Sequence, residues 1–406
     1  MSQVSASGGS YDPNVDPGPV NPPAILEPLA TLTGGVPQIW MAASGGPNWG
    51  GALVSIAFDS PGFVKYDYVG TITAPALQGI VNAGISYQPD PDTTNTLGID
   101  LTECAGIMPT SATNADADAF RTLAFLSAIF GSCVFTGSIS GTTLTVSSVT
   151  SGAIATGDYL YGVGVLPGTY VVSGSGLSWQ VNQSQATSVL GMAAMGSSAT
   201  VPANGELLAY GSVASTGTYT SDLTYLRRGL YGSTNRAHSV GEFFSRIDLG
   251  EVGTPPNSVL TYNLPPQYIG APFAVKFQSF NVFGNATEDI STVTEFVYSP
   301  TGAGYGGASG VAPTTPTGFV GYARGPGGAG FNVLDWNANP SSDHVQYYAV
   351  LRKLHSSGGY TTIGTTSGTE YTDNGAVSGN IYDYELEAVN AAGAGSAAGP
   401  VTLTTT

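Results

Sequence analysis

The chain has little charge, and positive charge is the scarcer of the two signs. Only 9% of its 406 residues are charged, against a usual fraction of about 25%. Ten residues are Lys or Arg, and the formal net charge is −17. Binding to nucleic acid or to anionic lipid requires surfaces rich in Lys and Arg, so the composition argues against both kinds of partner.

Cysteine, histidine and long apolar runs are also scarce. Cys104 and Cys133 are the two cysteines, and the sequence leaves open whether they pair or stay free. Three histidines without a His-x-x-x-His pair argue against zinc, and we expect no metal and no cofactor. No run of 18 apolar residues predicts a membrane span, and no charged and apolar leader follows Met1, so we expect no secretory signal.

The abundant residues indicate β-structure. Apolar residues make up 42% of the chain, with 22 Tyr and 15 Phe, and 57 glycines separate short apolar runs. Runs rich in β-branched and aromatic residues between Gly, Pro, Asn and Asp are typical of strands joined by tight turns. We therefore predict a mainly β chain of several domains.

Changes in composition divide the chain into segments. Prolines at the start predict an extended arm, with a flexible tail as the alternative. A Gly/Ser/Thr-rich stretch, in which Asp158 is the one charged residue, predicts a small β-module inserted into a host domain. The predicted segments are the arm at 1–30, the discontinuous host domain at 31–133 plus 201–300, the inserted module at 134–200, a Gly-rich linker at 301–311 and a last domain at 312–406.

The host domain contains one predicted helix, at residues 115–130. Asn114 suits its N-cap and Gly131 its end, while a buried strand over Thr122–Ile129 is the alternative, because a continuous apolar run fits both. The residues from Asn114 begin like a calcium loop, but the Gly and Glu that shape such a loop are missing. We expect a helix N-terminus there and no calcium.

Two carboxylates, Asp90 and Asp92, lie close together between prolines. A glycosidase holds two carboxylates across a sugar on a rigid scaffold, whereas alternating prolines describe an extended loop. We therefore expect a solvated turn at this position.

The last domain has period-two alternation and a Tyr-x-Tyr-x-Leu-x-Ala-Val-Asn pattern that begins at Tyr382. Together with Trp336, this pattern resembles fibronectin type III domains. The resemblance implies a β-sandwich with Trp336 and Leu386 in the core, and with Tyr382 as the corner tyrosine whose hydroxyl bonds back to the chain. It implies an architecture and no activity.

A second resemblance covers about 36–130 and 202–298. It rests on the order of several short motifs, of which Arg228-Gly229-Leu230-x-Gly232-Ser233 followed by His238-x-x-Gly241 is the most specific. These motifs resemble the C-terminal region of phage tail-tip and baseplate hub proteins, including the gene transfer agent protein called megatron. The inserted module is similar to the β-modules of tail fibres. The resemblance implies a distal tail component of a virion, synthesised in the host cytoplasm, with other tail proteins as partners and a homotrimer favoured.

Positive charge is concentrated in the stretch 226–241, where an active site, a phosphate clamp and a structural corner are the three candidates. No nucleophile elbow or phosphate loop accompanies it, and its glycines at 229, 232 and 241 suit turns. Arg228 presents five donors that suit carbonyls or a carboxylate such as Glu206 or Glu242, and His238 completes such a network. We interpret the stretch as a structural corner.

The inserted module holds a group of aromatic residues: Trp179, Tyr159, Tyr161 and Tyr170. Exposed Tyr and Trp bind sugars and proteins at low entropy cost, so these residues are candidate receptor or glycan contacts. Burial of Trp179 in the core of the small module is the alternative that we favour.

Two hypotheses of function follow. The first is a non-enzymatic structural component of a phage tail tip, baseplate or fibre, which helps assemble the tail and contacts a host receptor or glycan. The second is a secreted bacterial carbohydrate-active enzyme or adhesin with an accessory fibronectin type III module. The predicted series of β-modules and the lack of recognisable catalytic patterns favour the first hypothesis.

Overall fold

The computed structural model divides the chain into two compact units. The first unit comprises Met1–Leu26, Ile39–Tyr262 and Phe273–Tyr298, and the second comprises Glu27–Gln38, Asn263–Pro272 and Ser299–Thr406. Nearly all regular structure in the described residues is β-strand, which confirms the predicted fold class. The structure describes residues 12–28, 33, 37–104, 108–109, 112–247, 258–265, 268–302, 312–324, 330–340, 343, 345, 347–366, 368–390 and 393–406.

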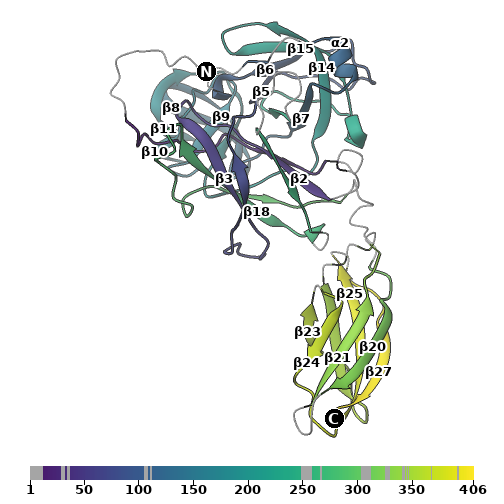
Figure 1. The fold of residues 1–406 in the computed structure, drawn as a ribbon. Helices are drawn as coiled ribbons and strands as arrows, with labels where there is room; N and C mark the ends of the chain where they lie inside the picture. Colours follow the sequence, from purple (N-terminus) through teal and green to yellow (C-terminus); the bar gives the residue numbers. More distant parts are fainter. Residues whose placement is uncertain are drawn as a thin grey trace. The chain divides into compact units, whose positions relative to one another are not determined.

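A closed barrel lies in the first unit (Figure 1). Successive side chains of a strand point to opposite faces, so alternate residues fill the barrel interior. Leu97, Leu208 and Phe244 fill it here and are all buried. Closure leaves no free strand edge, which protects the barrel against pairing with another chain. In barrel order, the strands are β14 (Glu206–Ser215), β15 (Thr220–Arg227), β6 (Leu97–Asp100), β5 (Gln78–Ala83), β16 (Phe243–Arg246) and β7 (Leu123–Ser127).

Two further sheets accompany the barrel. In the larger one, β3 and β18 form a long antiparallel pair in which Val54 lies opposite Phe277, and both side chains are fully buried. That sheet has the order β13 (Ser198–Thr200), β19 (Glu295–Tyr298), β18 (Phe273–Asn281), β3 (Trp49–Ala57) and β4 (Asp67–Ile72). The smaller sheet has the order β1 (Ala24–Leu26), β2 (Gln38–Ala42) and β17 (Val259–Asn263).

The predicted N-terminal arm packs on its own chain over the residues that the structure describes. Strand β1 pairs with β2, which places Ile25 opposite Met41, and Ile25 is fully buried. The prolines keep the segment extended, as expected, because each fixes its backbone φ and removes a donor. Residues 12–26 therefore belong to the first unit and are not a tail free of it.

The predicted helix at 115–130 is wrong. The structure has a short helix, α2 (Asn114–Asp118), whose N-cap is Thr113 and not Asn114. Thr113 and Asp116 form a capping box, in which each side chain accepts from the other residue's backbone N–H. The apolar run that follows forms β7, the alternative that the sequence left open. All five β7 residues are buried, because the strand lies between β14 and β16 in the barrel.

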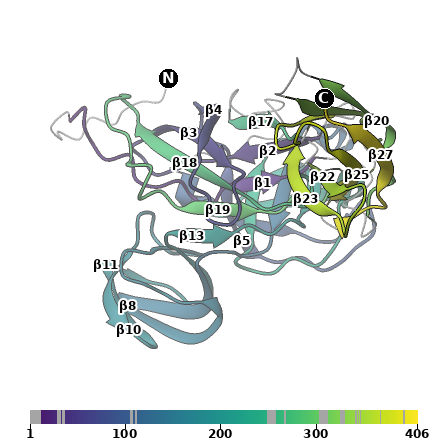
Figure 2. The ribbon, with the colours of Figure 1, turned by 90° about the horizontal axis from the view of Figure 1, so that it is seen from below.

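The inserted module forms a five-stranded sheet with its own core (Figure 2). Phe135, Leu144 and Met192 are buried in that core. Its two ends meet, since the backbone N–H of Ser132 donates to the carbonyl of Ala194 over 2.8 Å. In sheet order, the strands are β10 (Val171–Ser175), β11 (Ser178–Ala186), β8 (Cys133–Gly152), β12 (Leu190–Met195) and β9 (Tyr159–Gly162). Cys133 is a buried free cysteine, so the disulfide alternative does not hold for it.

The second unit contains a β-sandwich, as the sequence predicts (Figure 1). One sheet has the order β20 (Thr317–Arg324), β21 (Phe331–Asn337) and β24 (Glu370–Asp373). The other has the order β23 (Thr361–Thr366), β22 (Tyr347–Leu354), β25 (Ile381–Asn390) and β26 (Gly393–Ala394), and β27 (Ala398–Thr404) also pairs with β25. Most of the predicted linker, residues 303–311, lies outside the described residues.

The three predicted core residues of this sandwich are buried together. Trp336, Tyr382 and Leu386 belong to one apolar cluster. The ring of Trp336 packs edge-on against the ring of Tyr348, with centroids 5.2 Å apart. The hydroxyl of Tyr382 accepts the backbone N–H of Val377, five residues upstream, over 3.3 Å. This bond is the tyrosine corner that the fibronectin-like pattern implies.

Candidate functional site

The Arg-rich stretch begins where β15 ends. Arg228 directly follows the strand and is 3% exposed. Gly229 has φ of 58°, and a Cβ on it would lie 3.1 Å from the Cβ of Asn235. The chain needs glycine at this position, because other residues rarely adopt this left-handed conformation. The turn continues through the 3-10 helix η2 (Leu230–Gly232) and returns to the barrel, where Gly241 donates its N–H to the carbonyl of Val81 over 2.8 Å.

Arg228 holds two carboxylates inside the protein. Its Nε donates to Glu206 Oε1 over 2.6 Å, and its second terminal nitrogen donates to Glu206 Oε2 over 3.0 Å. Its first terminal nitrogen donates to Asp92 Oδ2 over 3.1 Å. All three side chains are inaccessible to solvent. The planar guanidinium matches the carboxylate of Glu206 with two parallel bonds, the strongest common form of ion pair.

His238 links the two glutamates that the sequence names. Its Nε2 lies 2.8 Å from Glu206 Oε2, and its Nδ1 lies 2.6 Å from Glu242 Oε2. Arg236 adds two bonds to the carboxylate of Glu242, of 2.8 and 2.9 Å. The structure therefore brings Arg228, Glu206, His238 and Glu242 into one charge network, and Gly229, Gly232 and Gly241 lie in the turns of the same stretch.

The carboxylates of the charge network stay ionised at neutral pH. Burial by itself raises the pKa of Glu206, but the hydrogen bonds from His238 and Arg228 outweigh it and lower the pKa to about 2. For Glu242 too, burial raises the pKa, but hydrogen bonds with His238 and Arg236 outweigh it, so the pKa is lowered and the carboxylate stays ionised. A general acid or base works best with a pKa near the working pH. With these lowered pKa values the two carboxylates are suited to ion pairing and poorly suited to proton transfer.

The loop with Asp90 and Asp92 is solvated only in part, since Asp90 and its flanking prolines are exposed whereas Asp92 is buried, which corrects the sequence-based expectation for Asp92. Asp92 is 1% exposed, because it pairs with Arg228. Asp90 accepts two bonds of 2.8 Å from Arg227, which also bonds Asp118 over 2.9 Å. Asp92 was not among the residues predicted to join the network. The sequence feature that could have identified Asp92 is a pair of nearby carboxylates in a chain with few Lys and Arg residues.

The aromatic residues of the inserted module divide into buried and accessible ones. Trp179 is 9% exposed and its Nε1 donates to the carbonyl of Gly176 over 3.0 Å, so it is a core residue and not a surface contact. Tyr161 is buried too, and its hydroxyl donates to the carbonyl of Val20. Tyr159 is half-buried and Tyr170 is exposed, with their ring centroids 5.7 Å apart.

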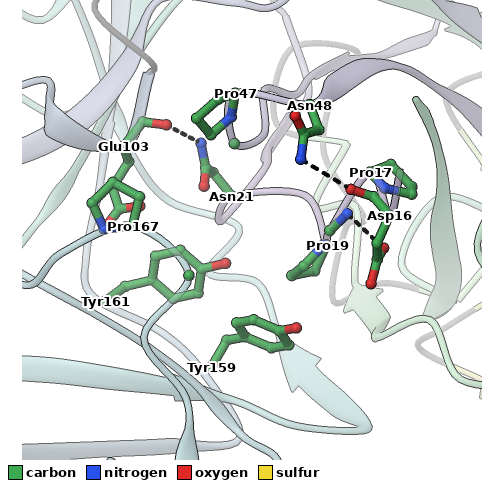
Figure 3. Close-up of a pocket in the computed structure, with 13 residues that line it drawn as sticks. Asp16, Pro17, Pro19, Asn21, Pro47, Asn48, Glu103, Tyr159, Tyr161 and Pro167 are labelled. Carbon is green, nitrogen blue, oxygen red and sulfur yellow. Dashed lines mark hydrogen bonds between the residues drawn. The ribbon is translucent and has the colours of Figure 1, made fainter. Parts of the chain in front are cut away.

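A pocket of about 230 Å³ lies between the inserted module, the N-terminal segment and the loop that precedes β3 (Figure 3). In Figure 3 the rings of Tyr159 and Tyr161 lie on one side of it, and Asp16, Pro47 and Asn48 lie on the other. We call it the Glu103 pocket. Its lining consists of Asp16, Pro17, Gly18, Pro19, Asn21, Gly46, Pro47, Asn48, Glu103, Tyr159, Tyr161, Pro167 and Gly168.

Glu103 differs from the carboxylates of the charge network. It lies on the 3-10 helix η1 (Thr102–Cys104), it is 6% exposed, and its Oε1 is buried with no hydrogen-bond partner. Burial, with a smaller contribution from the charge of Asp100, raises its pKa to about 8. A carboxyl with a strongly raised pKa in a pocket is a candidate for function. Glu103 was not among the residues predicted from the sequence, since no motif surrounds it.

Within the described residues, no cluster of His, Cys, Asp and Glu has the arrangement of a metal site. None of the described helices has the length and apolar character of a membrane span.

Comparisons with known proteins identify neighbours of fibronectin type III fold. No family model matches the sequence, and no curated protein matches it. A fibronectin type III-like protein from Clostridium thermocellum is 33% identical over 24% of this chain and 96% of its own, with a TM-score of 0.21. The chicken CNTN1 FN1–FN3 domains are 14% identical over 69% of this chain and 99% of their own, with a TM-score of 0.22. The sandwich assignment rests on the strand order and core described above, and the resemblance to tail proteins stays a prediction.

Proposed function

We propose that the protein is a structural component of a bacteriophage or phage-like tail tip, baseplate or fibre. In this role it helps assemble the tail and contact the host surface, as part of an extracellular particle. Other tail proteins are its expected partners, with a homotrimer as the favoured assembly and a host receptor or glycan as the target of contact.

The observation that carries this proposal is the buried charge network. The motif on which the tail-protein resemblance rests, from Arg228 to Gly241, forms a set of ion pairs inside the fold. Paired carboxylates with lowered pKa values suit a structural tie and do not suit proton transfer. The separate β-modules, each with its own core, fit the modular build that the tail-protein resemblance implies.

The alternative, a secreted carbohydrate-active enzyme, has weaker support. A retaining glycosidase needs two free carboxylates about 5 Å apart across a sugar. The two aspartates that the sequence suggested for this chemistry, Asp90 and Asp92, are both paired with arginines. An adhesin remains compatible with the accessible Tyr159 and Tyr170.

Immunogold electron microscopy of purified particles tests the proposal. An antibody against residues 312–404 should label one end of the tail, and particles without such label would contradict a tail-tip position. Purified protein incubated with host polysaccharide should release no new reducing ends. Depolymerisation would support the enzyme hypothesis instead.

A deletion tests the role of the inserted module. The carbonyl of Ala194 accepts the N–H of Ser132, so the two ends of the module can be joined by a short link. We expect removal of 134–196 to leave the host domain folded and to change adsorption of the particle. Insoluble protein after this deletion would count against an independent module.

A further inference from the structure

The Glu103 pocket offers hydrogen-bond acceptors and few free donors. Both donor positions of the Asn21 amide are in use, since its nitrogen donates to Ser44 Oγ and to the carbonyl of Glu103, each over 2.9 Å. The amide nitrogen of Asn48 donates to the carbonyl of Asp16. The hydroxyl of Tyr161 donates to the carbonyl of Val20. Amide oxygens and carboxyl groups therefore dominate the polar lining (Figure 3).

The pocket also lacks positive charge. Among the described residues that line it there are two carboxyls, Asp16 and Glu103, and no Lys, Arg or His. A second pocket of about 390 Å³ shares Tyr159 and Tyr161 with it and contains two more acids, Asp158 and Glu288. A protein of net charge −17 already attracts cations, and clefts of one sign concentrate ions of the other.

Glu103 is the group that lacks a partner. A buried carboxyl normally accepts hydrogen bonds, and each exception calls for an explanation. Here Oε1 has no donor among the described residues, although the rest of the lining is well bonded. The charge network shows that this chain supplies partners to other buried carboxylates, so the missing donor is a feature of this site.

We propose that the Glu103 pocket binds a compact organic cation through a primary ammonium group, which pairs with the Glu103 carboxylate and lies against the tyrosine rings. A primary ammonium carries three N–H donors, which match a lining of acceptors. The positive charge is attracted to aromatic faces. Pockets for drug-sized ligands measure about 300–1,000 Å³, so a pocket of about 230 Å³ suits a small amine such as ethanolamine. This inference does not depend on the proposed tail function.

Titration of the full chain with matched small molecules tests the proposal. Isothermal calorimetry at pH 8 should detect binding of ethanolamine, whose amine is protonated at that pH. N-acetylethanolamine, which has the same hydroxyethyl chain without the charge, should not bind. Choline, which has the charge without N–H donors, should bind at least fivefold more weakly than ethanolamine. Binding of N-acetylethanolamine or of choline as strong as that of ethanolamine would overturn the proposal.

The pH dependence supplies a readout that needs no variant. Glu103 must lose its proton to pair with ammonium, and an alkylammonium stays protonated between pH 6 and 8. For one carboxyl with a pKa of about 8, the affinity for ethanolamine should rise roughly 50-fold between these pH values. The titratable groups that surround Glu103 are Asp100, Asp16, Tyr159 and Tyr161.

Carbon-13 NMR of the glutamate carboxyls should show one group that titrates near pH 8 and whose titration shifts to lower pH when ethanolamine is added. A flat affinity would overturn the proposal.

A conservative pair of variants locates the site. Glu103→Gln keeps the shape and removes the charge, and it should weaken ethanolamine binding at pH 8 by about 10- to 100-fold, the usual effect of a charged hydrogen bond. Glu370→Gln changes an exposed carboxylate on β24 and should leave binding unchanged. Unchanged binding in a folded Glu103→Gln protein would overturn the proposal.

Discussion

Glu206 and Glu103 are both buried glutamates of the first unit, and their surroundings give them opposite proton affinities. Glu206 accepts bonds from Arg228, His238 and two backbone N–H groups, and its pKa is about 2. Glu103 has an unpartnered Oε1, and burial raises its pKa to about 8. The same side chain is a permanent anion in one place and holds its proton at neutral pH in the other.

The difference lies in the partners, because both residues are removed from water. Burial costs an unpaired charge several kcal/mol, and nearby donors and cations offset that cost. The charge network supplies them within the chain, whereas the Glu103 pocket leaves room for a ligand to supply them. Four predictions test this contrast, each by changing one side of it.

Removal of the central cation should have the largest effect. Arg228→Met leaves Asp92 and Glu206 buried without their arginine partner, and we expect the free energy of unfolding of the first unit to fall by about 3–5 kcal/mol. Urea denaturation at pH 7 measures it. As a control, Arg121→Met removes a solvent-exposed pair of 3.7 Å and should cost at most about 1 kcal/mol. Equal losses of unfolding free energy in the two variants would show that the buried ion pairs stabilise the protein no more than the surface pair.

Removal of the charge on Glu206 should reveal its lowered pKa. Since the folded-state pKa of about 2 lies below the ordinary 4.5, the stabilisation is present above pH 4.5 and is lost as pH falls toward 2. Glu206→Gln should therefore lower the free energy of unfolding by about 3 kcal/mol at pH 7, and the difference from wild type should shrink below pH 4.5. Denaturation curves at pH 7, 4.5 and 3 measure this trend. A difference that grows at low pH would contradict it.

The corresponding substitution, Glu103→Gln, should raise the free energy of unfolding at pH 7, whereas Glu206→Gln lowers it. Its folded-state pKa of about 8 lies above the ordinary 4.5, so stability is highest below pH 4.5 and falls as pH rises toward 8. Glu103→Gln cannot ionise, and it should be more stable than wild type at pH 7 by about 2–3 kcal/mol, with little difference at pH 4. The same denaturation series measures it. Parallel curves for the variant and wild type would mean that Glu103 has an ordinary pKa.

The smallest effect is expected at a neutral tie in the second unit. Tyr382→Phe removes the hydroxyl that accepts from Val377 and from Asn380, at the cost of about 1 kcal/mol. Hydrogen exchange of peptides from residues 331–390 should speed up, while peptides of the barrel stay unchanged. A loss as large as that of Arg228→Met would show that uncharged and charged ties contribute equally in this protein.

Patterns local to one segment could be predicted from the sequence. Alternation predicted the sandwich, the fibronectin-like pattern implied Trp336 and Leu386 in its core, and the need for a turn was visible at Gly229. The apolar run at 123–127 was misread as helix, because burial on both faces in a barrel removes the alternation that identifies a strand. The ion-pair partners of Arg228 that are distant along the sequence were predicted only in part. Glu206 and Glu242 were named, but Asp92 was expected in solvent.

The sequence by itself determined a mainly β chain of separate modules, because strand periodicity and turn residues act over a few neighbouring positions. Tertiary structure alone decided which carboxyls are ionised. No sequence motif marks Glu103, and its surroundings in the fold come from Asn21, Pro47 and Tyr161, which are distant along the chain. A pKa is set by the charges, donors and solvent within a few ångströms of a group, and only the folded chain fixes those distances.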